Sequence, residues 1–170
     1  MGIITCDFGM GGALANFAGL LHMTMHSLTK SAIFFAVGHI AQVKGTQRIA
    51  DMGGLTETNP VLGWGLVLGV VAIAGLPPLG IFMSEFLVVT STFARAPWLA
   101  IILVFGVLIG VAALFLRLNT IAFGEPRGAT AKAKASYAPM FAHLALVFAA
   151  GIYLPPVLVD WFQNVARLLG

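Results

Sequence analysis

The sequence predicts an all-α membrane protein, a polytopic bundle of transmembrane helices. Hydrophobic residues make up 59% of the 170-residue chain and charged residues only 9%, against roughly 25% charged in a typical soluble domain. The apolar residues gather in four long stretches, not in the short alternating segments of a transmembrane β-barrel. Each stretch exceeds the about 20 residues that a helix needs to cross the bilayer core. A water-soluble fold is therefore excluded.

We expect four full spans within a single membrane domain, residues 1–170. The predicted spans cover approximately residues 13–42, 61–93, 98–123 and 138–159. Residues 1–8 are apolar but too few to span a bilayer, and they lack the basic region and cleavage site of a signal peptide. We interpret them as the end of a truncated helix, followed by a tight glycine turn into the first span. A disordered or interfacial N-terminus is the alternative.

The second predicted span is too long for one continuous helix. Its 33 residues would extend about 50 Å as an α-helix, whereas the hydrocarbon core is about 30 Å thick. In the sequence Gly75-Leu76-Pro77-Pro78-Leu79-Gly80, the prolines lack backbone donors and the glycines loosen the chain. We therefore predict a discontinuous helix, broken at Gly75, Pro77, Pro78 and Gly80, whose free backbone groups face protein or water. A simple proline kink is the alternative.

The distribution of charge predicts an orientation and leaves two charged groups inside the membrane. Lys and Arg gather in loops 43–60 and 124–136, so the positive-inside rule makes both loops cytoplasmic and the C-terminus extracytoplasmic. The net charge of +3 is too dispersed to indicate a nucleic-acid partner. Thirteen of the fifteen charged residues lie in predicted loops, at span ends or within snorkelling reach of the surface. The exceptions are Lys30 and Glu85.

Lys30 lies deep in the first predicted span, and two histidines precede it at helical spacing. His22, His26 and Lys30 recur every four residues, which places them on one helix face over about 12 Å. Such a row can pass protons through intervening water, so we predict a proton-translocation role for all three residues. Paired histidines can also bind metal, but no carboxylate or Cys ligand accompanies them and Lys30 would repel a cation, so we expect no metal site. A structural lysine bonded to carbonyls of a neighbouring helix is the other alternative.

Glu85 follows the second proline by seven residues, in the second half of the broken helix. A carboxylate beside an unwound stretch that admits water can load and release protons, so we add Glu85 to the predicted proton-translocation residues. Pairing with a loop or a neighbouring subunit is the alternative. We interpret Arg117 as an interfacial anchor, and His39 and His143 as structural residues.

Four motifs occur in a specific order: the run 22–35, Met52-Gly53-Gly54-Leu55, the segment 74–80, and Ser84-Glu85-Phe86. In this order they resemble the antiporter-like membrane subunits of respiratory complex I, multisubunit sodium/proton antiporters and energy-converting hydrogenases, with the hydrogenase-4 branch the most similar. The resemblance covers only the last third of such a subunit and begins inside its tenth helix.

This resemblance implies a proton-translocating subunit, in whole or in part, of a redox complex in a bacterial or archaeal cell membrane. It implies Lys30 as the central proton carrier with His22 and His26 beside it, and Glu85 as the titratable residue of the broken helix. The implied partners are other membrane and peripheral subunits, which would hold any nickel–iron or iron–sulfur centres or quinone, and the lipid bilayer. We expect no cofactor and no redox chemistry in this chain itself. A non-pumping structural or assembly anchor and a cation/proton antiporter component are the alternatives.

Overall fold

The computed structural model describes residues 2–131 and 136–170, in which every regular element is a helix. Lys132 and Lys134, which contribute to a predicted cytoplasmic loop, lie outside the described residues. The elements are α1 (Gly2–Met10), α2 (Ala13–Lys44), η1 (Ile49–Asp51), α3 (Leu55–Thr58), α4 (Pro60–Ile73), α5 (Gly80–Arg95), α6 (Pro97–Leu118), η2 (Asn119–Phe123), α7 (Ala138–Ile152) and α8 (Pro156–Leu168). The prediction of an all-helical bundle is confirmed.

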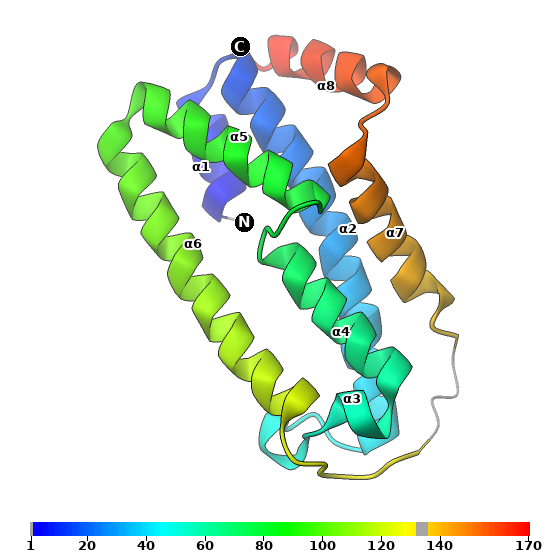
Figure 1. Ribbon diagram of the computed structural model, residues 1–170. Coiled ribbons are helices and arrows are strands. Elements are labelled where there is room, and N and C mark those ends of the chain that lie inside the picture. Colours follow the sequence, from blue (N-terminus) through cyan, green and yellow to red (C-terminus); the bar gives the residue numbers. More distant parts are fainter. Residues whose placement is uncertain (1, 132–135) are drawn as a thin grey trace.

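Helix α2 is the centre of the bundle, and α1, α4, α5, α7 and α8 all pack against it (Figure 1). Small residues occupy much of its buried surface, so neighbouring backbones can approach closely; these residues are Ala15, Ala18, Gly19, Ala32 and Ala36. The turn from α1 into α2 consists of Gly11 and Gly12, whose φ angles are +65° and +84°. Such angles favour glycine, so the expected glycine turn is present.

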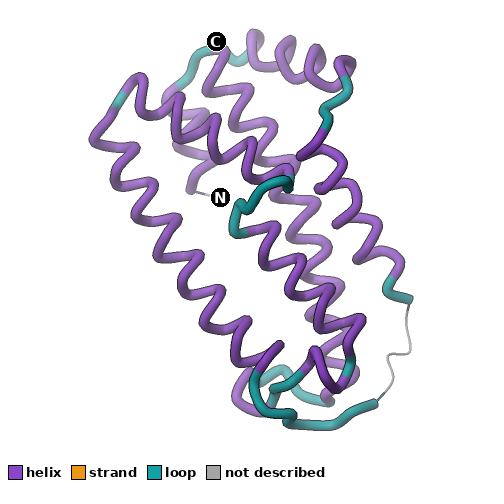
Figure 2. The backbone as a smooth tube through the Cα atoms, in the orientation of Figure 1, coloured by secondary structure: helices purple, strands orange, loops and turns teal. Residues whose placement is uncertain are grey.

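The second predicted span is divided between α4 and α5. Helix α4 ends at Ile73 and α5 begins at Gly80, and the connecting segment contains both adjacent prolines. Gly75 has a φ angle of +68°, a conformation that side chains with a Cβ rarely adopt. The connecting segment lies midway along the length of the molecule rather than at either end (Figure 2), and Leu76, Pro77 and Pro78 within it are exposed.

The last predicted span, 138–159, differs from the structure because the helix does not continue through it. Helix α7 ends at Ile152, and α8 begins at Pro156 at an angle of 83°. Pro155 and Pro156 cannot donate the backbone hydrogen bonds that would extend α7. Helix α8 therefore lies across the end of the bundle (Figure 1), with Phe162 buried in the protein core and Trp161 exposed.

Helix α8 is tied to the beginning of α2. The side-chain amide of Asn16 donates to the carbonyls of Ala166 and Gly170, both at 3.2 Å. The backbone N–H of Gly12 also donates to the Gly170 carbonyl, at 2.7 Å. The C-terminal end of the described chain therefore meets the α1–α2 turn at one end of the bundle (Figure 1).

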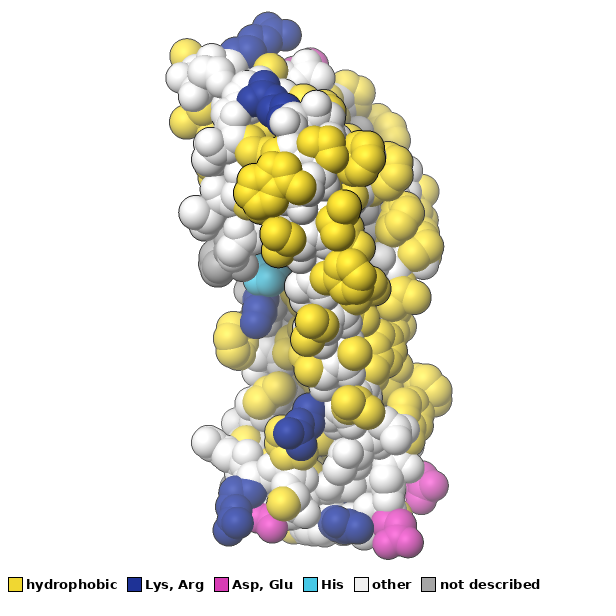
Figure 3. All heavy atoms as spheres, turned by 90° about the vertical axis from the view of Figure 1, so that its left-hand side faces the viewer, with side chains coloured by type: hydrophobic (Ala, Val, Ile, Leu, Met, Phe, Trp, Pro, Cys, Tyr) yellow, Lys and Arg dark blue, Asp and Glu magenta, His cyan; other side chains and the backbone are white. Residues whose placement is uncertain are grey.

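Helix α6 and η2 run along the edge of the molecule and expose apolar side chains. Among the described residues, Pro97–Phe123 is the one continuous helical stretch that is long and apolar enough to cross a membrane by length and hydropathy alone. Only 6% of its most apolar part is buried. Figure 3 shows apolar side chains over much of this face, with acidic and most basic side chains toward the ends of the molecule. The prediction of four spans goes beyond this finding and stays a prediction.

The end of the bundle opposite α8 is held together by a buried lysine. Lys44 is only 4% exposed, and its Nζ donates to the carbonyl of Arg127 at 2.8 Å and to Thr58 Oγ1 at 3.3 Å. Burial lowers the pKa of the Lys44 ammonium. Lys44, which belongs to the predicted loop 43–60, is thus out of water, because two loops fold over the end of α2 and cover its side chain.

Candidate functional site

The centre of the candidate site is a hydrogen bond between α2 and α5. His22 is 2% exposed, and its Nδ1 lies 3.0 Å from the hydroxyl oxygen of Ser84. The Ser84 hydroxyl itself donates to the carbonyl of Ile81 at 2.9 Å. Because a hydroxyl has one proton to donate, Nδ1 of His22 must be the donor in its bond to Ser84. In neutral His22 the other ring nitrogen, Nε2, is then the one that can accept a proton.

The predicted row on α2 runs from the interior of the bundle to its surface. The rings of His22 and His26 lie 5.6 Å apart between centroids, and His26 is half-buried. Lys30 is exposed on the described helices, and its Nζ lies 5.9 Å from the centroid of the Phe34 ring. The three residues share one side of α2 as predicted from their spacing, but they differ in their surroundings.

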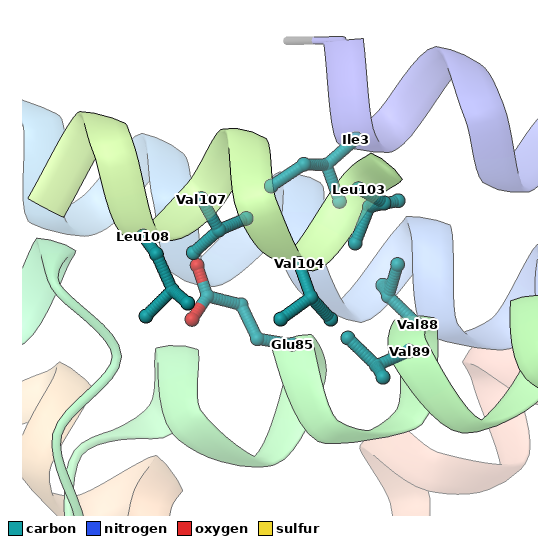
Figure 4. A pocket seen from close by; sticks show the side chains of 8 residues that line it. All are labelled: Ile3, Glu85, Val88, Val89, Leu103, Val104, Val107 and Leu108. Atoms are coloured by element: carbon teal, nitrogen blue, oxygen red, sulfur yellow. The ribbon is translucent and has the colours of Figure 1, made fainter. Parts of the chain in front are cut away.

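Glu85 lies next to Ser84 and against the break in the second span. A Cβ added to Gly75 would overlap the Glu85 carboxylate, so the carboxylate occupies space that only a glycine leaves open. Its side chain also borders a cavity of about 150 Å³ between α5, α6 and α1, whose other lining residues are apolar (Figure 4). These residues are Ile3, Val88, Val89, Leu103, Val104, Val107 and Leu108.

The structure thus brings His22, Ser84, Glu85 and Gly75 together at one level of the bundle. No hydrogen bond or ion pair joins the Glu85 side chain to any other described residue, so its carboxyl group has no fixed partner. The arrangement resembles other discontinuous membrane helices, in which titratable side chains lie close to the unwound backbone. The site can exchange protons, since the imidazole of His22 and the carboxyl group of Glu85 can each bind and release one proton.

Two residues at or near this site were missed from the sequence alone. Ser84 is a common residue in membrane helices, and only the packing of α5 on α2 reveals that it fixes the tautomer of His22. Asp7 is among the thirteen charged residues predicted to lie in loops, at span ends or within snorkelling reach, but it is fully buried, and neither carboxylate oxygen has a hydrogen-bond partner among the described residues. The signal in the sequence that could have indicated the burial of Asp7 is its position among the apolar residues of α1.

The remaining histidines have local partners. Nδ1 of His39 donates to the carbonyl of Phe35 at 2.6 Å, and Nδ1 of His143 donates to that of Pro139 at 2.7 Å. Each bond stays within one helix, between residues four apart. These contacts agree with the interpretation of both histidines as structural residues.

A central helix packed against a broken helix, with titratable side chains where the two meet, defines a class of membrane-embedded helical subunits. Comparison with known families identifies the group. The family model described as "NADH:quinone oxidoreductase/Mrp antiporter, TM" matches residues 1–111, and the chain belongs to this family.

The individual relatives agree with this assignment. The chain is 63% identical over 169 residues to a hydrogenase-4 component F homolog of Methylacidiphilum infernorum, covering 99% of this chain and 36% of the relative. It is 34% identical over 148 residues to NADH-quinone oxidoreductase subunit M of Mycobacterium tuberculosis, covering 81% of this chain and 26% of the relative. The chain therefore spans about a third of the length of these curated relatives, or less.

A solved structure has the same fold. The structure of the Mrp complex from Dietzia sp. DQ12-45-1b superimposes with a TM-score of 0.85, over 98% of this chain and 40% of the matched chain. The sequence identity is 18%, so this match concerns the arrangement of helices alone. The resemblance noted from the four sequence motifs is confirmed at the level of the family.

Proposed function

We propose that this chain forms part of a proton-translocating membrane subunit of a hydrogenase-4-like or complex I-like redox complex. The observation that carries the proposal is the His22–Ser84 hydrogen bond, because it joins the titratable row of α2 to the broken helix beside Glu85. Membership of the family and the identity to a hydrogenase-4 component F homolog support the same function.

In this proposal, protons move along α2 and leave through the broken helix. Lys30 is the central carrier, and His26 and His22, whose ring centroids lie 5.6 Å apart, relay protons through water. Nε2 of His22 accepts the incoming proton while Nδ1 keeps its bond to Ser84. Glu85 is the exchange site, and the break at Gly75, Pro77, Pro78 and Gly80 supplies the hydrated path beside it.

The proposal includes a membrane topology. Four spans cross the bilayer, formed by α2, by α4 with α5, by α6 with η2, and by α7, while α8 lies at the surface. Loops 43–60 and 124–136 are cytoplasmic and the C-terminus is extracytoplasmic, in accordance with the positive-inside rule. Electron transfer takes place in partner subunits, which hold the nickel–iron or iron–sulfur centres or the quinone.

The direct test is to replace Lys30 in the complete complex. Lys30→Ala should lower the number of protons translocated per electron, because it removes the central carrier. Arg48→Ala is the matched control, since Arg48 is an exposed cation whose only described ion pair is with Asp51 in the same loop. An unchanged proton-to-electron ratio in Lys30→Ala would refute the proposal.

A second candidate function is cation/proton antiport, because the family description includes the Mrp antiporter and the fold matches an Mrp complex. Proton and sodium fluxes in proteoliposomes distinguish the two. Redox-driven proton movement without sodium dependence supports the leading proposal, and sodium-dependent proton movement without an electron donor supports antiport. A non-pumping anchor of the complex would produce neither flux.

A further inference from the structure

Asp7 is a buried acid that the proposed proton path does not use. It is fully buried in the described structure, and both carboxylate oxygens lack a hydrogen-bond partner there. A carboxyl group in this situation is unusual, because buried polar groups are normally satisfied and a bare carboxylate is costly to bury. Packing alone does not explain an acid at this position, since an apolar residue would avoid that cost.

The position of Asp7 is fixed by close packing between α1 and α2. The Cβ of Asp7 lies 3.2 Å from the position that a Cβ on Gly19 would occupy, so α1 approaches α2 where α2 has no side chain. His22 follows Gly19 by three residues, which is the same side of α2 and about 4.5 Å farther along its axis. Asp7 is therefore within about one helical turn of the buried His22.

On its other side, Asp7 lies close to the end of the bundle that carries α8. Met10, the last residue of α1, follows Asp7 by three residues, and the guanidinium of Arg95 donates to the Met10 carbonyl. Arg95 is exposed, so solvent reaches the bundle there. Helices α2 and α5 pack against α1, and their titratable or charged groups are His22, His26, Lys30, His39 and Lys44 on α2, and Glu85 and Arg95 on α5.

We propose that Asp7 is a proton-exchange residue, placed between His22 and the end of the bundle formed by the α1–α2 turn. This inference rests on the proposed proton-translocating function. The Asp7 carboxylate accepts one proton that leaves Nε2 of His22 through water and becomes a neutral acid. It then releases that proton to water at the α1–α2 turn and returns to the carboxylate. One proton enters and one leaves, and no electron is transferred.

A bound metal cation fits this position less well than a proton. A cation such as Na⁺ needs several oxygen ligands, whereas no other His, Cys, Asp or Glu among the described residues forms a cluster of three with Asp7. Neither oxygen of Asp7 has a hydrogen-bond partner among the described residues either. The proton needs only the carboxylate and a water molecule.

The experiment compares two Asp7 variants and a control variant in the complete complex, reconstituted in sealed vesicles and driven by its electron donor. Asp7→Asn keeps the size of the side chain but cannot titrate, and Asp7→Glu keeps the titratable group. Asp160→Asn is the matched control, because Asp160 is an exposed acid on α8. We expect Asp7→Asn to slow proton translocation roughly tenfold or more at unchanged assembly, since a positioned proton-transfer group contributes typically 10²–10⁴-fold. Asp7→Glu should recover much of the rate, with a shifted pH profile, and Asp160→Asn should match the wild type.

The outcomes separate this inference from the proposed function. Normal translocation and a normal pH profile in Asp7→Asn would overturn the role of Asp7, while a loss in Lys30→Ala would leave the proposed function standing. Normal translocation in both variants would overturn both. If Asp7→Asn does not assemble, Asp7→Ala, which only removes atoms from the tight contact with Gly19, is measured in its place. Failure of every non-titratable variant to assemble would identify Asp7 as a structural residue and overturn the inference.

Discussion

Replacing Gly75 with alanine should slow proton translocation by moving Glu85 away from the helix break. Gly75 has a φ angle of +68°, where a residue with a Cβ costs roughly 1–2 kcal/mol more than glycine. The new methyl group would also overlap the Glu85 carboxylate, which must then leave its position. If displacement of the carboxylate raises the activation free energy of proton transfer by a similar amount, the rate of translocation falls about tenfold, because each 1.36 kcal/mol changes a rate tenfold.

The assay is donor-driven proton translocation by the complete complex in sealed vesicles, normalised to electron transfer. Gly106→Ala is the matched control, because nothing lies within 4 Å of a Cβ added at Gly106 on α6. A double variant, Gly75→Ala with Glu85→Ala, separates the steric effect from backbone strain. If the alanine acts through Glu85, the double variant is no worse than Glu85→Ala alone. A wild-type rate in Gly75→Ala would refute the reasoning, and an additive loss in the double variant would assign the effect to strain.

Three further substitutions test contacts in the structure. Ser84→Ala should slow proton translocation and destabilise the bundle by about 1–3 kcal/mol, because it leaves the buried Nδ1 of His22 without its partner; proton flux and thermal denaturation measure the two effects. Lys44→Met should make the loops at that end more susceptible to limited proteolysis with little effect on proton flux, and an unchanged cleavage rate would contradict the role of its hydrogen bonds. Phe162→Ala should release α8 and expose the 153–155 link to protease, at a cost of about 3–5 kcal/mol, while Trp161→Ala, at an exposed position, should not.

The features predicted well from the sequence are those that depend on local chemistry. Adjacent prolines cannot continue a helix wherever they occur, so the division near Pro77 and Pro78 follows from residue type. The shared face of His22, His26 and Lys30 follows from a spacing of four residues. Neither prediction needs knowledge of which helices are neighbours, and the structure has both features. Whether these residues carry protons stays a prediction.

The features that were missed depend on contacts between distant segments. Lys44 and Asp7 are both charged residues near the ends of apolar stretches, and both are among the thirteen charged residues predicted to lie in loops, at span ends or within snorkelling reach. Their burial results from loops folding over one end of α2 and from α1 packing on Gly19 near the other. The bend after α7 is different, because Pro155 and Pro156 carried the same signal as the earlier proline pair. The predicted span 138–159 nevertheless continues past these prolines, because it follows the apolar residues on both sides of them.

The contacts between α8 and α2 have a practical consequence for measuring motion in this protein. Asn16 and Gly12 bond α8 and the chain after it to the beginning of α2, so the two helices tilt together. Leu168, on α8, is 86% exposed. A spin label or fluorophore at this accessible position would therefore report displacements of α2. The titratable residues of α2 cannot themselves be labelled, because a label would destroy their chemistry.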